Sequence, residues 1–341
     1  MGAGRGHAGS IRNRMAAGCP RFPIPILRPM KGVKLERTGT AGVLVLGASG
    51  FLGAQLVRRL GAAEARRRGA LSGVCRRPEA LLEILTVPPA CALVAQDLAP
   101  AGAGAEIVRR LRPRCVFLVA ALARPAACEG DPASAERLNS ELPGEVAGAC
   151  AALGSRLVHV STDLVFAGRA PGGGYPETAV PDAASIYGRS KARGESAVLE
   201  SYPAALVVRL PLLYGDSMGR GLGASDGLLA ALQRGERPHL FADEWRTPLD
   251  VAAAAGALVD LAETDAGGLM HVAGPRRLSR LELGQAVLAA GGQAADRLRP
   301  AVRSSIPGCA DRPRDVSLCS ARALALLPKP LPSPEQALGT C

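Results

Sequence analysis

The sequence predicts an α/β fold, in which a Rossmann-like, doubly wound parallel sheet is followed by a smaller C-terminal region. Short, almost uninterrupted apolar runs alternate from residue 43 with longer stretches rich in Ala, Leu and Arg. This rhythm is typical of buried parallel strands covered by helices on both faces. The first apolar run also ends in a glycine-rich turn that opens a helix. With 341 residues, 48% of them hydrophobic, the chain is long enough for one large domain or two smaller ones.

The individual elements follow from the same pattern. The apolar runs predict strands at residues 43–46, 71–75, 92–95, 114–120, 156–160, 205–210 and 269–272. The stretches between them predict helices at residues 52–68, 105–111, 133–153, 187–200, 228–234, 251–263 and 279–290. Ser279 is expected to cap the last helix, because Glu282 completes a capping box three residues later. Four glycines between residues 219 and 227 predict a loop.

The net charge of +11 does not indicate a nucleic-acid-binding protein, because much of it lies in one short segment. Residues 1–40 hold eight Lys or Arg against one acid, whereas the rest of the chain holds 33 against 29. The aromatic content of 3% also argues against stacking platforms for single strands. Since residues 1–40 lack apolar periodicity, we expect a disordered basic extension there. The alternatives are a start codon assigned too early and an organellar transit peptide.

The cysteines and apolar runs indicate the compartment. Nine cysteines occur without a CxxC pair, which predicts reduced thiols in the cytoplasm and no metal site. The longest apolar runs, such as residues 116–123, are too short to span a bilayer. A membrane protein is therefore not expected.

The glycine-rich turn predicts a dinucleotide site. Glycines let the backbone turn tightly and approach a pyrophosphate, while the N-terminus of the following helix supplies N–H donors. A tight turn without a ligand is the alternative. The turn residues expected to contact the cofactor are Gly47, Ser49, Gly50, Phe51, Leu52 and Gly53.

The end of the second strand predicts which dinucleotide binds. An NAD site usually has an acid there that binds the ribose 2′-hydroxyl. This strand instead ends in Arg76 and Arg77, with no acid before Glu79. Guanidinium groups match a 2′-phosphate, so NADP(H) is expected in preference to NAD(H). Two solvated arginines are the alternative.

Tyr187 and Lys191 form a YxxxK pair that shares one face of a predicted helix. An ammonium about 4 Å from a phenol is worth about 4 kcal/mol at an effective dielectric constant near 20. That would lower the pKa of the tyrosine from about 10 towards 7 and make it a proton donor at neutral pH. The alternative is an ordinary pair on the helix surface.

Two hydroxyl groups, Ser161 and Thr162, end the fifth strand ahead of this helix. A hydroxyl at the carboxyl end of a strand can hydrogen-bond a substrate carbonyl beside the tyrosine. The alternative is a side chain that caps the next turn.

Together these motifs resemble the extended short-chain dehydrogenase/reductase superfamily, and most closely the dTDP-4-dehydrorhamnose reductase family, which also includes the β regulatory subunit of methionine adenosyltransferase. The resemblance covers about residues 43–320. The matching stretches are VLVLGASGFLG (43–53), CVFLVAALARP (115–125), LN (138–139), HVSTDLVFAG (159–168), IYGRSKARGE (186–195), VVRLPLLYG (207–215), DEWRTP (243–248), HVAG (271–274) and RPRDVSL (312–318).

The resemblance implies roles for particular residues. It implies a catalytic set of Thr162, Tyr187 and Lys191, of which Tyr187 and Lys191 would also contact the cofactor. It implies further cofactor contacts at Asp97 and Leu98 (the adenine), at Ala120 and Ala121 after the fourth strand, and at Asn139 behind the site. For the substrate it implies contacts from Asp163, Phe166 and Arg246.

The chain departs from the family pattern at several positions. Leu164 and Asp315 stand where the reductases often have Tyr and Asn, and DEWRTP differs from their substrate loop. No Glu follows Asp163, so the dehydratase activity found elsewhere in the superfamily is not expected. The resemblance therefore supports the family's cofactor site and catalytic set in this chain more strongly than it supports the family's sugar substrate.

The expected function is an oxidoreductase that uses NADPH to reduce a keto group on a nucleotide-sugar-like substrate. The alternatives are a non-catalytic NADP-binding regulatory subunit and a nucleotide-sugar epimerase. Residues 41–214 are expected to form the NADP-binding domain and residues 215–341 the substrate-binding region, with residues 251–273 returning to the first domain. A small-molecule substrate is expected, nucleic acid and membrane are not, and a homodimer or a protein partner stays open.

Overall fold

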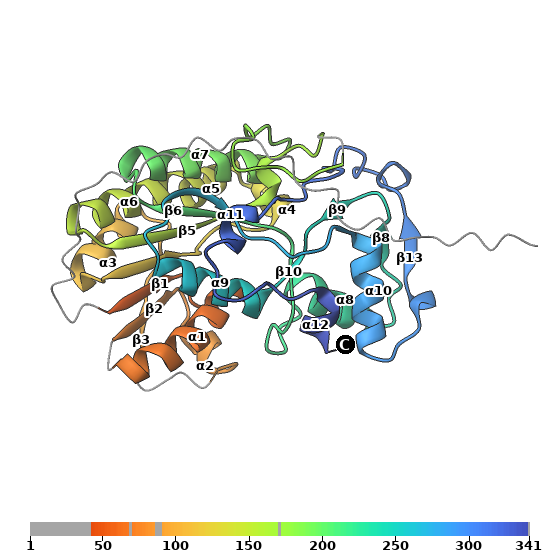
Figure 1. Ribbon diagram of the computed structural model, residues 1–341, viewed down its shortest axis with the longest axis horizontal. Coiled ribbons are helices and arrows are strands. Elements are labelled where there is room, and N and C mark those ends of the chain that lie inside the picture. Colours follow the sequence, from red (N-terminus) through yellow and green to blue (C-terminus); the bar gives the residue numbers. More distant parts are fainter. Residues whose placement is uncertain (1–41, 68–69, 86–90, 170–171, 340–341) are drawn as a thin grey trace, which may run out of the picture. The chain divides into compact units, whose positions relative to one another are not determined.

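The computed structural model describes residues 42–67, 70–85, 91–169 and 172–339 (Figure 1). The chain divides into two units, Met1–Lys34 and Leu35–Cys341, and everything described below belongs to the second. The predicted basic extension, residues 1–40, lies outside the described residues.

A seven-stranded, all-parallel sheet forms the centre, in the order β11-β6-β5-β4-β1-β2-β3. The order reverses between β1 and β4, which is the switch point of a doubly wound fold. The prediction of a Rossmann-like parallel sheet is therefore confirmed. The strands are β1 (Val43–Leu46), β2 (Leu71–Cys75), β3 (Cys91–Ala95), β4 (Cys115–Leu118), β5 (Arg156–Thr162), β6 (Leu206–Leu210) and β11 (Gly268–His271).

Helices cover both faces of this sheet (Figure 1). Side chains of α1 (Phe51–Arg67) and α9 (Val251–Ala262) form one apolar core with the strands. Side chains of α3 (Ala103–Leu111), α6 (Leu142–Leu153) and α7 (Ile186–Ser201) form a second core on the other face. The strands are buried between the two layers, which explains their nearly continuous apolar runs.

A smaller group of elements follows β6. Its apolar cluster joins α8 (Gly223–Gln233) to α10 (Arg280–Ala290), and Ser279 and Glu282 form the predicted capping box on α10. The remaining strands are β7 (Leu213–Tyr214), β8 (His239–Phe241), β9 (Trp245–Arg246), β10 (Leu249–Asp250), β12 (Leu278–Ser279) and β13 (Arg299–Ala301). The remaining short helices are α2 (Glu79–Leu82), α4 (Pro125–Gly130), α5 (Pro132–Glu136), α11 (Ala321–Leu324), α12 (Pro334–Leu338) and the 3₁₀ turns η2 (Asp163–Val165), η3 (Ala295–Arg297) and η4 (Arg303–Ser305).

Two expectations need correction. The single helix expected at residues 133–153 is α5 and α6 joined by a π-helical turn, η1 (Arg137–Glu141). The loop expected at residues 219–227 ends early, because α8 begins at Gly223 and tolerates its glycines. Among the described residues, no helix is long and apolar enough to cross a bilayer, and no cluster of side chains is suited to hold a metal ion.

Candidate active site at the carboxyl edge of the sheet

The glycine-rich turn joins β1 to α1 through close backbone contacts. Gly47 has a φ of +97°, and a Cβ atom there would lie 2.7 Å from the backbone nitrogen of Ala120. A Cβ atom on Gly53 would collide with the carbonyl oxygen of Gly47. The backbone N–H of Gly50 closes the turn by donating to that same carbonyl at 3.0 Å. Positive φ and close packing therefore require glycine at positions 47 and 53.

The position of this turn is that of a cofactor site in a doubly wound fold. Gly47 follows β1 and Ala120 follows β4, so the two residues meet at the switch point. Ligands of such folds bind in the crevice at the carboxyl ends of the strands on either side of that point. Ala120 and Ala121 are half-buried there, as a surface against a cofactor would be. This backbone cradle fits the pyrophosphate of a dinucleotide.

The other predicted adenine-side residues lie beside the same edge. Arg76 and Arg77 directly follow β2 and are exposed, so both guanidinium groups are available to a 2′-phosphate. Asp97 is exposed, and its Oδ1 accepts a hydrogen bond of 3.0 Å from the N–H of Ala99. Leu98, by contrast, is buried in the apolar core, so a cofactor contact through its side chain is not supported.

Thr162, at the end of β5, has the cap role that was the alternative prediction. Its Oγ1 accepts a hydrogen bond of 3.1 Å from the N–H of Leu164, and donates one of 2.9 Å to Oδ1 of Asp163. The Thr162 side chain also lies close enough to Tyr187 to lower the pKa of the phenol. The structure thus places Thr162 near Tyr187, as predicted, while the Thr162 side chain also caps the turn η2.

The pKa of Tyr187 differs from the prediction. Burial raises it above the usual tyrosine range, and the nearby carboxylate of Asp163 raises it further, while the neighbouring Thr162 side chain opposes both effects. Tyr187 therefore carries its proton at neutral pH. The expectation that Lys191 lowers this pKa is wrong for the structure as it stands.

The reason is the direction of the Lys191 side chain. Its Nζ donates a hydrogen bond of 2.7 Å to the carbonyl oxygen of Val160 and lies 3.5 Å from Nε2 of His159. Lys191 is 2% exposed, and burial lowers its pKa to about 8. The pair Tyr187 and Lys191 shares a face of α7 as predicted, but the ammonium group is directed at β5.

The predicted substrate residues Asp163 and Arg246 form part of a buried ion network. Nε of Arg246 lies 3.4 Å from Oδ2 of Asp163, and its Nη2 donates to Glu244 at 3.2 Å. Glu244 also accepts two hydrogen bonds from Arg312, of 2.7 and 3.1 Å. Burial raises the pKa of Asp163 to about 6, although Arg246 acts in the opposite direction.

Phe166 was predicted to contact substrate, but in the structure it is buried. Its side chain is 0% exposed and stacks on Tyr175, with ring centroids 4.1 Å apart. The guanidinium carbon of Arg209 lies 5.1 Å from the Phe166 ring, and Arg209 is held by two hydrogen bonds to Glu195. Phe166 therefore packs the core behind the site.

Asn139 holds the segment after β4 in place. Its Oδ1 accepts from the N–H of Leu122 at 2.9 Å, and its Nδ2 donates to the carbonyl of Leu122 at 3.0 Å and to Oγ of Ser190 at 3.1 Å. Asn139 lies in the π-helical turn η1, a geometry that is frequent at functional sites. It therefore holds the segment after β4 against α7, where Ser190 lies.

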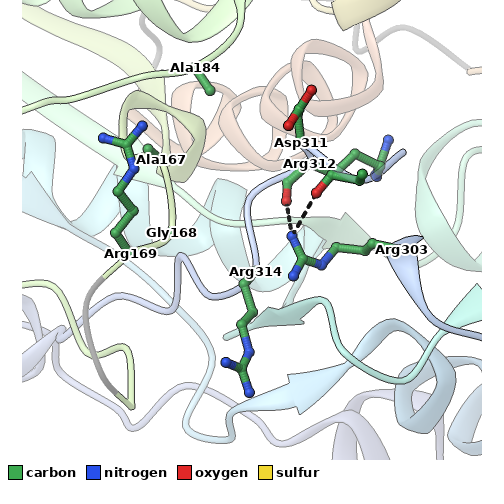
Figure 2. Close-up of a pocket in the computed structure, with 9 residues that line it drawn as sticks. Ala167, Gly168, Arg169, Ala184, Arg303, Asp311, Arg312 and Arg314 are labelled. Atoms are coloured by element: carbon green, nitrogen blue, oxygen red, sulfur yellow. Dashed lines mark hydrogen bonds between the residues drawn. The ribbon is translucent and has the colours of Figure 1, made fainter. Parts of the chain in front are cut away.

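One cavity lies apart from the glycine-rich turn (Figure 2). It has a volume of about 570 Å³, and four arginines line it: Arg169, Arg303, Arg312 and Arg314. Figure 2 shows the side chains of Arg169 and Arg314 pointing away from one another, while Arg303 donates to the carbonyl oxygens of Ala310 and Arg312. Since the guanidinium groups do not converge, the cavity does not form a defined anion site.

The sequence did not indicate two features of the site. Glu244 lies in the DEWRTP stretch, but nothing in the sequence indicated that it would pair with both Arg246 and Arg312. Arg220 donates a hydrogen bond of 2.6 Å to the carbonyl oxygen of Ser49 in the glycine-rich turn. No sequence signal could have shown this contact, because the two residues lie 171 positions apart.

Known proteins resemble this chain over most of the fold. The RmlD substrate binding domain matches residues 41–341. The chain is 32% identical over 223 residues to methionine adenosyltransferase 2 subunit beta from Bos taurus, which covers 63% of this chain and 66% of that protein. It is 36% identical over 203 residues to dTDP-4-dehydrorhamnose reductase from Mycobacterium tuberculosis, covering 58% and 66%. The matches thus span just under two thirds of these curated relatives.

A solved structure supports the fold. The dTDP-4-dehydrorhamnose reductase from Bacillus anthracis, in complex with NADP, has a TM-score of 0.72 to this chain at 24% identity, and the match covers 88% of this chain and 98% of that one.

Proposed function

The chain belongs to the family of the RmlD substrate binding domain, and from this premise we propose that it is an NADPH-dependent reductase of a keto group on a nucleotide-sugar-like substrate. The observation that carries the proposal is that Thr162 lies beside Tyr187, close enough to affect the pKa of its phenol. They lie at the carboxyl edge of the same parallel sheet as the glycine-rich turn. Reduction of a carbonyl group needs a hydride donor and a proton donor at the same place. The glycine-rich turn would hold the cofactor that donates the hydride, and Tyr187 would donate the proton.

The residues around the glycine-rich turn would hold the cofactor. The cradle of Gly47, Gly50 and Gly53 fits the pyrophosphate, and the exposed Arg76 and Arg77 fit the 2′-phosphate. NADPH, when bound, supplies the hydride for the carbonyl carbon. Preference for NADP(H) over NAD(H) rests on these two arginines and on the missing acid at the end of β2.

Tyr187 would give its proton to the carbonyl oxygen of the substrate. Its raised pKa keeps the phenol protonated at neutral pH, as a proton donor requires. Thr162 would orient that oxygen through its hydroxyl group. Lys191, with a pKa of about 8, would reach the cofactor ribose once its ammonium turns from Val160.

The experiment that tests this proposal is the substitution Tyr187→Phe. Oxidation of NADPH by a panel of keto-sugar nucleotides should be lost, because the proton donor is removed. NADPH binding should remain, because the substitution removes only one hydroxyl group. Tyr202→Phe is the matched control: this tyrosine ends the same helix and is half-buried, so its variant should keep full turnover.

A second candidate is a regulatory subunit that binds NADP without turnover, supported by the similarity to methionine adenosyltransferase 2 subunit beta. Wild-type protein that binds NADPH, turns over no substrate of the panel and captures a protein partner would favour this candidate. Tightly retained NAD with no net oxidation would instead favour an epimerase.

A further inference from the structure

A segment of the C-terminal region lies directly on the glycine-rich turn. Arg220 donates to the carbonyl oxygen of Ser49 at 2.6 Å, and the carbonyl of Asp216 accepts a hydrogen bond of 2.8 Å from Nε2 of Gln55 on α1. Gly223 packs so closely on Phe51 that a Cβ atom there would lie 2.5 Å from the ring. Residues 215–223, hereafter the strap, therefore cover the first turn of α1 and the loop before it.

The strap holds Arg220 in a defined position. Ser217 is completely buried, and its N–H and Oγ both donate to Oδ2 of Asp226, at 2.7 and 2.6 Å. The carbonyl oxygen of Ser217 in turn accepts a hydrogen bond of 2.9 Å from Nε of Arg220. Two of the three guanidinium nitrogens are thus fixed by backbone oxygens, one of them in the glycine-rich turn itself.

The third nitrogen, Nη2 of Arg220, is buried and has no hydrogen-bond partner among the described residues. An unpaired donor on a charged group is unfavourable when it is removed from water. Burial also lowers the pKa of Arg220, and the nearby Asp216 only partly opposes this. The Asp216 carboxylate is itself engaged, since its Oδ1 accepts from the N–H of Met218 at 2.6 Å. Nη2 of Arg220 therefore keeps its donor capacity unused among the described residues.

We propose that Arg220 binds the diphosphate of the nicotinamide cofactor, so that the strap contributes a cofactor ligand to the glycine-rich turn. The turn offers backbone N–H groups and the N-terminus of α1, whose first turn holds no acid. A guanidinium group bonded to the Ser49 carbonyl lies beside any phosphate held by those groups, and arginine binds phosphate with paired N–H donors.

This inference rests on the cofactor-binding part of the proposed function and not on turnover. The competing explanation is that Arg220 only clamps the strap to Ser49 through Nη1. A clamp stabilises the fold whether or not a cofactor is present. A phosphate ligand instead changes the affinity for the dinucleotide and its dependence on salt.

The test uses the full chain and fluorescence titration with NADPH and with NADH. Arg220→Gln should weaken both dinucleotides by the same factor, about tenfold or more, the range expected for one lost hydrogen bond to a charged group. The ratio of the two affinities should stay unchanged, because the two cofactors share the diphosphate and differ only in the 2′-phosphate. The decrease of affinity with added salt should be less steep than in the wild type. Arg220→Lys, which keeps the charge, should recover part of the affinity.

The control is Arg234→Gln, since Arg234 is exposed and its salt-bridge partner among the described residues is Glu236, so both affinities should stay at the wild-type level. Unchanged affinities in Arg220→Gln, or an altered preference between NADPH and NADH, would overturn the inference. A lower melting temperature without cofactor, combined with an unchanged salt dependence, would assign Arg220 to the clamp alone. Failure of the proposed function would look different: the wild type would bind NADPH but reduce no keto-sugar.

Discussion

Asp163 should make the protein less stable as the pH rises from about 4 to about 6. Asp163 is 3% exposed, and among the described residues its salt-bridge partner is Arg246, at 3.4 Å and without a hydrogen bond. Burial raises its pKa from 3.8 to about 6. Within that pH range the folded chain therefore keeps a proton at Asp163 that the unfolded chain has released.

The size of the effect follows from this pKa difference. When the folded state holds more protons than the unfolded state, the free energy of unfolding falls as pH rises. The shift from 3.8 to about 6 corresponds to about 3 kcal/mol, fully lost once the pH is above both values. Asp163→Asn cannot lose a proton, so this contribution to the pH dependence disappears.

Urea unfolding of wild type and Asp163→Asn between pH 4 and pH 7.5 checks this prediction. The unfolding free energy of the variant, minus that of the wild type, should rise by about 2.5 kcal/mol over that range, because part of the total effect is already lost at pH 4. Asp131→Asn is the control: hydrogen bonds from Ser134 lower the pKa of Asp131 below its usual 3.8, so its pH-dependent contribution is lost only at more acidic pH and its difference from the wild type should stay nearly flat over this range. A difference for Asp163→Asn that is flat with pH, or that falls, would refute the reasoning.

Three further outcomes are expected. Replacing both Arg76 and Arg77 by Ala should weaken NADPH about tenfold or more and leave NADH nearly unchanged in a titration; equal affinities in the wild type would contradict this. Gly53→Ala should abolish NADPH binding and lower the melting temperature, because its Cβ collides with backbone, whereas Gly148→Ala, where a Cβ meets nothing within 4 Å, should do neither. Asn139→Ala should lower the unfolding free energy by about 2–4 kcal/mol in urea, because it leaves backbone groups after β4 without partners; a loss under 1 kcal/mol would show that the segment does not depend on it.

The parts of the fold that depend on local pattern could be predicted. Continuous apolar runs require burial on both faces, so they identified the parallel strands, and the glycine spacing identified the turn after β1. The π-helical turn at Arg137–Glu141 could not be predicted, since the stretch that follows is rich in Ala and Gly and does not show the one-residue shift of the apolar pattern that such a turn introduces.

The parts of the site that depend on distant neighbours could not be read from the sequence. Helical spacing placed Tyr187 and Lys191 on one face, but the direction of the ammonium group is decided by the carbonyl of Val160 on β5. Likewise, the aromatic ring of Phe166 is buried because Tyr175 stacks on it, a packing partner that no motif contains. The motif residues were therefore easier to place than their orientations.

The return of the chain to the sheet limits how this protein can be divided. β6 pairs with β5 on one side and with β11 on the other, and β11 lies more than fifty residues further along the chain. A fragment ended at residue 214 would keep β6 but lose β11 and α9, so one edge of the sheet would present unpaired N–H and C=O groups. The apolar face of α1 that packs on α9 would also meet water. Such a fragment is prone to associate edge to edge. To express the fragment that ends at residue 214 by itself, residues 251–273, which contain α9 and β11, should be fused to its end.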